Sequence, residues 1–135
     1  MAAIYHGRSI CNGLAEGEAL VTTQGLSFLG GVDPETGIIT EVGHELYGQE
    51  LNGKIFVVPN LKGSTAGMWI IIRLAENKKG PKAIITRRAD AILVGAVIMA
   101  GIPTVDSLPV DPLQAFKSGI RLKVDGTKGV VEVVK

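Results

Sequence analysis

The sequence predicts an α/β fold with a central parallel sheet and a second β layer. In the middle of the chain, β-branched apolar runs at residues 54–58, 82–86 and 102–105 alternate with helical patterns that begin near residues 64 and 91. Strands that are joined through helices run parallel, with right-handed crossovers. The second β layer is predicted from the two ends of the chain, which have strand patterns without helices between them.

At the N-terminal end, residues 3–13 contain short strand-like runs broken by glycine, and residues 16–23 form a longer strand pattern. At the C-terminal end, residues 120–124 and 130–134 flank a glycine-containing turn, which is typical of a β-hairpin. We expect this hairpin to pair with the N-terminal strands.

Helix boundaries are indicated by capping residues. Asp90 is the expected N-cap of a helix over residues 91–100, which is apolar nearly all round and is therefore expected to be well buried. Asp111 precedes a proline and should cap a short helical turn. Ser64 or Thr65 is suited to cap the helix that follows the strand at residues 54–58.

Length and composition indicate one domain over residues 1–135. Hydrophobic residues make up 46% of the chain, charged residues 20%, and the net charge is +1. These values argue against disorder and against nucleic-acid binding through bulk charge. The longest apolar run, residues 91–102, is too short to span a bilayer, and the N-terminus lacks a signal-peptide pattern. We therefore expect a soluble, cytoplasmic protein without a membrane partner.

Metal-ligating residues are scarce. Cys11 is the only cysteine, so this chain alone cannot hold an iron–sulfur cluster or a structural zinc through cysteines. His6 and His44 are isolated in the sequence, and lone histidines in loops are more often surface or hydrogen-bonding residues than ligands. No metal site is predicted in this chain.

The chemistry is expected where the strand at residues 54–58 runs through Pro59 and a glycine-containing turn into the next helix. A helix N-terminus reached through Gly63 favours anions such as carboxylate or phosphate, and Lys62 adds a full positive charge. The turn is not a nucleotide-binding P-loop, because the lysine precedes the glycine. A plain strand-to-helix turn capped by Ser64 remains an equally good interpretation of the local sequence.

Other candidate residues lie in two segments. Residues 24–53 form a long segment rich in turn formers, in which Gly30 and Gly31 would let backbone approach a ligand and Asp33 could cap a turn or contact a substrate. Arg87 and Arg88 follow a predicted strand at the sheet edge where α/β folds bind ligands, although surface or structural roles are also open to them. The expected substrate-contacting residues are Lys62, Gly63, Thr65, Gly30, Gly31, Asp33, Arg87 and Arg88.

Several long motifs occur in one order along nearly the whole chain. They are residues 27–37 (Ser-Phe-Leu-Gly-Gly-Val-Asp-Pro-Glu-Thr-Gly), residues 44–49 (His-Glu-Leu-Tyr-Gly-Gln), residues 53–59 leading into Lys62-Gly63-Ser64-Thr65, and residues 81–85. In these motifs the sequence resembles the small, swivelling-domain subunits of the aconitase X family, most closely those of archaea.

The resemblance implies a swivelling β/β/α domain and a larger partner subunit that carries an iron–sulfur cluster as Lewis acid. In such lyases the swivelling domain supplies a serine as general base, and Ser64 is the matching position. Classical aconitases continue with a second serine and an arginine, whereas Thr65 and Ala66 follow here. An anion-binding role would then pass to Arg87 or Arg88.

Three functions are compatible with the sequence. The first, implied by the resemblance, is a hydro-lyase subunit of the archaeal mevalonate pathway that dehydrates mevalonate 5-phosphate to trans-anhydromevalonate 5-phosphate. The second is dehydration of another hydroxy acid, by an aconitase-like or a hydroxyproline dehydratase. The third is a non-catalytic ligand-binding or carrier domain, which would need an exposed histidine at the junction that neither His6 nor His44 provides.

Overall fold

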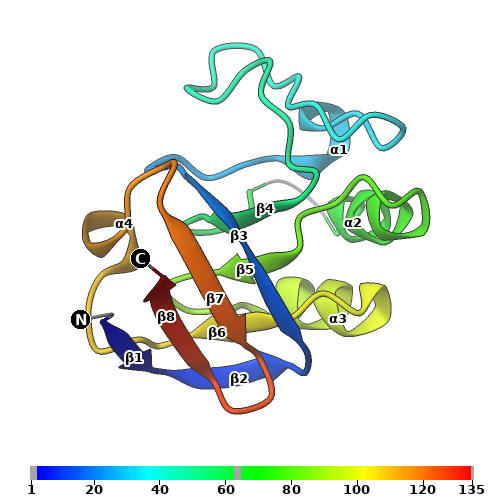
Figure 1. The fold of residues 1–135 in the computed structure, drawn as a ribbon. Coiled ribbons are helices and arrows are strands. Elements are labelled where there is room, and N and C mark those ends of the chain that lie inside the picture. The colour runs from blue at the N-terminus through cyan, green and yellow to red at the C-terminus, as the bar shows by residue number, and fades with distance from the viewer. Residues whose placement is uncertain (1–2, 63–64, 135) are drawn as a thin grey trace.

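The computed structural model describes residues 3–62 and 65–134, which form one eight-stranded sheet with helices against it (Figure 1). The elements in chain order are β1 (Ile4–His6), β2 (Arg8–Cys11), β3 (Leu14–Val21), α1 (Phe28–Gly31), β4 (Lys54–Val57), α2 (Gly67–Glu76), β5 (Ala83–Ile85), α3 (Ala91–Ala100), β6 (Thr104–Asp106), α4 (Pro112–Ala115), β7 (Arg121–Asp125) and β8 (Val130–Val134).

The sheet has the order β1-β8-β7-β3-β4-β5-β6-β2. Its central strands β3, β4, β5 and β6 are mutually parallel, and the outer pairs are antiparallel. The predicted parallel sheet is therefore confirmed. The predicted C-terminal hairpin is also confirmed, because β7 pairs antiparallel with β8. It pairs with the N-terminal strands as predicted, β7 with β3 and β8 with β1.

The strands form two stacked β layers. In Figure 1, β3, β7 and β8 cross over β4, β5 and β6, and α2 and α3 lie beside the second layer. Consecutive strands β1 and β2 join opposite ends of the strand order, since β1 pairs with β8 and β2 pairs with β6. Gly7 lies between them, donates its N–H to the carbonyl oxygen of Gly129 at 2.7 Å, and has no room for a Cβ against the carbonyl oxygen of Asp106.

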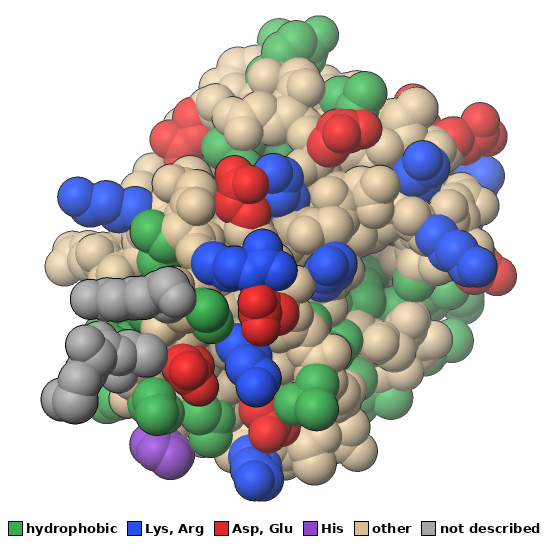
Figure 2. All heavy atoms as spheres, in the orientation of Figure 1, with side chains coloured by type: hydrophobic (Ala, Val, Ile, Leu, Met, Phe, Trp, Pro, Cys, Tyr) green, Lys and Arg blue, Asp and Glu red, His purple; other side chains and the backbone are tan. Residues whose placement is uncertain are grey.

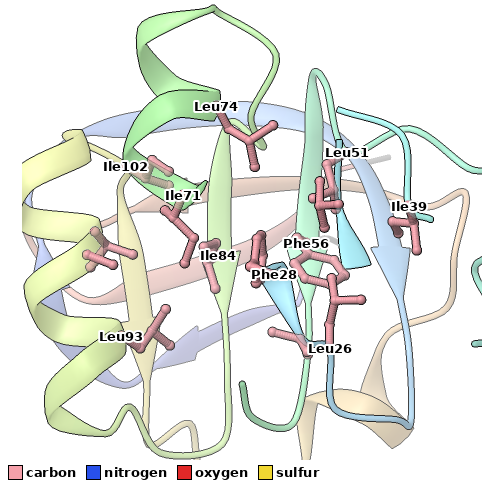
Figure 3. Close-up of a cluster of buried hydrophobic side chains, with 14 of the residues drawn as sticks. Leu26, Phe28, Ile39, Leu51, Phe56, Ile71, Leu74, Ile84, Leu93 and Ile102 are labelled. Carbon is pink, nitrogen blue, oxygen red and sulfur yellow. The ribbon is translucent and has the colours of Figure 1, made fainter. Parts of the chain in front are cut away.

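Two apolar cores hold the layers together. One lies between the two β layers and includes Ile55, Ile85, Phe116 and Val124. The other lies between the sheet, the helices and the segment at residues 24–53. Figure 3 shows its residues Phe28, Phe56, Ile71, Ile84 and Leu93 together with others of the same cluster. This arrangement is the predicted β/β/α architecture.

The two long helices differ from the prediction in detail. Asp90 caps α3 as predicted, because its carboxylate accepts the N–H of Leu93 at 2.8 Å. However, the expected burial of this helix all round is wrong, since Ile98 is 57% exposed and Met99 is 60% exposed. The apolar face that packs on the sheet is only one side of the helix.

The start of α2 also lies later than predicted. Its N-cap is Ala66, which has helical dihedral angles and no side-chain cap hydrogen bond, so Thr65 does not cap the helix. Ser64, the other predicted cap, lies outside the described residues. The carbonyl oxygens of Thr65 and Ala66 accept the N–H groups of Met68 and Trp69 at 3.1 and 3.2 Å. These two hydrogen bonds form the first turn of the helix.

Charged side chains of both signs intermingle on the face shown in Figure 2. Two ion pairs join charged residues of β3 and its neighbours, Arg121–Glu16 at 2.6 Å and Lys54–Glu18 at 3.5 Å. No helix within residues 3–62 and 65–134 is long and apolar enough to cross a membrane.

A buried carboxylate, that of Asp106, joins β6 to the neighbouring strand β2. Asp106 of β6 is completely buried and accepts hydrogen bonds from Nε and Nη2 of Arg8 at 2.9 and 2.7 Å and from the N–H of Ala89 at 2.8 Å. Burial acts to raise the pKa of Asp106, but the hydrogen bonds from Arg8, Ala89 and Ser107 outweigh burial and hold it below its ordinary value.

We predict that Asp106 makes the fold sensitive to acid. Because its pKa is lower in the folded chain than in the unfolded chain, its contribution is present above the unfolded value of about 3.9 and is lost as pH falls through the folded value. Asp106→Asn should lower the free energy of unfolding by about 2 kcal/mol at neutral pH and flatten its decline in acid. Denaturant titrations from about pH 6 to about pH 2 measure both effects.

Arg8→Met is the second variant, because it removes the same ion pair by replacing the arginine and not the aspartate. An Asp106→Asn chain with the wild-type acid dependence would contradict the prediction.

Candidate functional site at the carboxyl edge of the parallel strands

The segments that follow the parallel strands are tied together at one edge of the sheet. Thr86 follows β5 in the chain, and Pro59 follows β4. The hydroxyl of Thr86 donates a hydrogen bond to the carbonyl oxygen of Pro59 at 3.0 Å. Leu26, which follows β3, donates its N–H to Asn60 at 3.3 Å and accepts the N–H of Lys62 at 3.1 Å. These bonds place the predicted junction beside two other strand ends.

A small pocket with a cavity volume of about 20 Å³ lies at this edge. Its lining residues come from four segments: Phe28, Leu61, Lys62, Gly67, Met68, Asp90 and Ile92. The N-terminal ends of α2 and α3 therefore meet the segment after β4 here. Gly63 and Ser64, the predicted glycine and general base, lie outside the described residues. Thr65 is exposed beside the start of α2.

Lys62 is not a free cation. Its ammonium lies 2.6 Å from Oε2 of Glu41, and Oε1 of the same carboxylate accepts the N–H of Ser27 at 2.9 Å. Burial acts to raise the pKa of Glu41, but the hydrogen bonds from Lys62 and Ser27 and the nearby positive charge lower it overall. Glu41 was not predicted from the sequence, because the residues around a glutamate in a loop do not indicate that it pairs with a distant lysine.

A second carboxylate attaches residues 24–53 to the end of β3. Oε1 of Glu45 accepts hydrogen bonds from the hydroxyl of Thr22 and from the N–H of Thr23, the latter at 2.7 Å. The Thr22 hydroxyl is the main cause of the lowered pKa of Glu45. The signal that could have found Glu45 was its place in the motif at residues 44–49.

His44 is buried in the same segment, with 5% of its surface exposed. Its Nε2 lies 3.2 Å from the carbonyl oxygen of Gly25, and its Nδ1 accepts the N–H of Leu46 at 3.0 Å. Because both ring nitrogens are engaged, His44 is placed as a structural residue and not as an exposed phosphate carrier.

The structure gives the predicted residues Gly30, Gly31 and Asp33 different surroundings. Gly31 packs against Glu41, whereas Gly30 has a φ of +79° and open space where a Cβ would lie. Asp33 accepts the N–H of Glu35 at 2.9 Å and so caps a turn, one of its two predicted roles. That turn contacts Asn77 at the C-terminal end of α2, away from the pocket at the N-terminal end of the helix.

The two predicted arginines have different surroundings. Arg87 donates from Nε and Nη2 to the two oxygens of Asp111 at 3.0 and 2.9 Å, so a structural ion pair occupies it. Asp111 also caps α4 by accepting the N–H of Leu113, as predicted. Arg88 is exposed and has no side-chain partner within residues 3–62 and 65–134. Of the two, Arg88 is therefore the side chain available to an anion.

The described residues do not fit an iron–sulfur cluster or another metal. Within them, no group of three His, Cys, Asp or Glu side chains could hold a metal ion. The Cys11 thiol lies 3.5 Å from the carbonyl oxygen of Val97 on α3, and burial raises its pKa, which disfavours the thiolate that ligates metals.

Comparison with known proteins identifies the family. The family model of the aconitase X swivel domain matches residues 4–133. The chain belongs to this family. The predicted resemblance and the swivelling-domain fold are thereby confirmed.

Related proteins of the aconitase X family match nearly the whole chain. The phosphomevalonate dehydratase small subunit of Pyrococcus furiosus is 48% identical, with 95% of this chain and 93% of that protein covered. The protein of the same name from Methanocella arvoryzae is 44% identical, covering 94% and 96%. The crystal structure of Thermococcus kodakaraensis aconitase X in its holo-form superposes with a TM-score of 0.93 at 44% identity, covering 98% of this chain and 99% of that one.

Proposed function

We propose that this chain is the small subunit of a heteromeric hydro-lyase that dehydrates mevalonate 5-phosphate to trans-anhydromevalonate 5-phosphate. The observation that carries the proposal is the near-full-length match to relatives that share one name, phosphomevalonate dehydratase small subunit, at up to 48% identity. The small-subunit name supports a larger partner. A pocket lined by Lys62 at the carboxyl edge agrees with a small anionic substrate.

The large subunit would carry the iron–sulfur cluster in this proposal, since the described residues of the small subunit offer no set of ligands for it. The small subunit would contribute charge and proton transfer. Lys62 and Arg88 would bind anionic groups of the substrate, and Ser64 would take the proton that is lost with the hydroxyl group. Gly63, Thr65, Gly30 and Gly31 would shape the same edge.

Ser64 needs help to act as a base. The pKa of a serine hydroxyl lies many units above neutrality, and each unit corresponds to about 1.36 kcal/mol. A helix N-terminus supplies at most about 2 kcal/mol, and the N–H groups of Met68 and Trp69 in α2 already bond to Thr65 and Ala66. The remaining stabilisation would come from Lys62 and from exclusion of water when the large subunit closes over the edge.

Reconstitution tests the proposal directly. The chain, a large subunit from the same organism and the mixed complex are each incubated anaerobically with mevalonate 5-phosphate, and product formation is followed by phosphorus NMR. We expect turnover by the complex alone. Turnover by the isolated chain, or a complex that dehydrates only unphosphorylated hydroxy acids, would contradict the proposal.

Replacing Ser64 separates a catalytic role from a purely structural one. In the complex, Ser64→Ala should lower kcat and kcat/KM together by at least about a hundredfold, the range of a lost acid–base group. Folding should stay intact. Thr65→Ala is the matched control, and we expect a much smaller effect from it. Near-normal turnover of Ser64→Ala would remove Ser64 from the mechanism.

The two arginines should behave differently on substitution. Arg88→Ala should raise KM about tenfold, as expected for a lost charge-assisted hydrogen bond, with the midpoint of thermal unfolding unchanged. Arg87→Ala should instead lower the unfolding midpoint, because it breaks the pair with Asp111 that fixes α4. Steady-state kinetics and thermal unfolding of both variants decide the assignment, and equal KM effects would refute it.

A further inference from the structure

The carboxylate of Glu41 divides its two oxygens between the backbone and Lys62. Oε1 accepts the N–H of Ser27 at 2.9 Å, which fixes the direction of the carboxylate, and Oε2 faces the Lys62 ammonium at 2.6 Å. The Glu41 side chain is 19% exposed, whereas that of Lys62 is 50% exposed. The carboxylate is therefore the anchored partner, and the lysine is the partner that reaches solvent.

This arrangement leaves the lysine able to bind a second anion. An ammonium group has three N–H donors, and Glu41 occupies one of them. Lys62 also lines the pocket at the start of α2 and α3. A long lysine side chain ordinarily loses much rotational freedom when it binds a ligand. The ion pair with Glu41 already restricts the lysine side chain before the ligand binds, so less freedom is lost on binding. Preorganised binding sites gain affinity in the same way.

We propose that Glu41 is the positioning residue that holds the Lys62 ammonium toward the phosphate group of the substrate. The inference rests on the proposed function, in which Lys62 binds an anionic group. It gives the segment at residues 24–53 a part in substrate binding through Lys62, because Glu41 and Ser27 both belong to that segment.

Gly31 has a specific part in this arrangement. A Cβ at Gly31 would lie 3.2 Å from the Cβ of Glu41 and 3.3 Å from its Oε1. A side chain there would press on the carboxylate that holds Lys62. Gly30 has no such neighbour, since nothing lies within 4 Å of its Cβ position. The glycine pair therefore combines a turn at Gly30 with room for Glu41 at Gly31.

A double-mutant cycle distinguishes positioning from a role in which Glu41 only attaches the segment to Ser27. In the complex, Lys62→Met should raise KM for mevalonate 5-phosphate about tenfold, and Glu41→Gln should raise it several-fold. In the Lys62→Met background, Glu41→Gln should give no further increase. Effects that multiply in the double variant would overturn the inference, as would a wild-type KM for Lys62→Met.

Gly31→Ala and Gly30→Ala extend the test with matched variants. Gly31→Ala should raise KM as Glu41→Gln does, and this increase should also vanish in the Lys62→Met background. Gly30→Ala strains the backbone at a positive φ without touching Glu41, so its effect should be the same with and without Lys62. A Gly31→Ala complex with the wild-type KM would count against the inference.

A measurement without turnover keeps this inference separate from the proposed function. Inorganic phosphate is titrated into the full chain while the lysine side-chain Cε signals are followed by NMR. The Lys62 signal should shift, and the apparent Kd should rise several-fold in Glu41→Gln. If the wild-type complex lacks dehydratase activity, the proposed function fails and this titration alone decides. The inference is overturned if the Lys62 signal does not shift with phosphate, or if the wild-type chain and Glu41→Gln have the same Kd.

Discussion

The closure of the sheet by Asp106 and Arg8 is the constraint on which the rest of the structure depends. A completely buried carboxylate is costly unless it is paired, and here Arg8 and the N–H of Ala89 supply the partners. Through them, one side chain joins the N-terminal strand β2, the last parallel strand β6 and the loop that enters α3. The position of the pocket wall at Asp90 follows from this junction.

Carboxylates organise the carboxyl edge in a similar way, through ion pairs and hydrogen bonds. Glu41 and Glu45 each reach from residues 24–53 to a different strand end, Glu45 to the end of β3 and Glu41 to Lys62 behind β4. Asp111 does the same for Arg87 behind β5. Lys62 and Arg87 are thus paired within the chain, and Arg88 is left as an exposed cation after β5. A large subunit that completed the site would meet side chains that the chain itself already holds in place.

The parallel strands, the hairpin and two of the helix caps could be predicted from the sequence because each depends largely on local patterns. Asp90 and Asp111 cap the residues that immediately follow them, and β-branched runs prefer extended backbone. The start of α2 could not be predicted to the residue, since Ser64 and Thr65 have equally good capping chemistry, whereas the helix begins at Gly67. Burial of α3 was overestimated because an apolar sequence does not say which faces have neighbours.

The candidate site was predicted only in part for the same reason. Lys62 and the sheet edge follow from a local strand-to-helix pattern. Its partner Glu41, by contrast, lies on a long segment without regular secondary structure, and only the fold brings the two together. The distinction between Arg87 and Arg88 likewise depends on Asp111, which is distant in sequence. Side-chain pairing across loops is tertiary information, and neighbouring residues in the sequence do not contain it.

The single tryptophan of the chain gives this edge a built-in optical signal. Trp69 lies in the first turn of α2, next to the pocket-lining Met68, and is 56% exposed. Indole emission shifts to shorter wavelength and changes in intensity when water leaves its surroundings. Covering the edge with another protein would therefore alter the intrinsic fluorescence of the chain, and emission from this one residue can follow assembly in real time without a label.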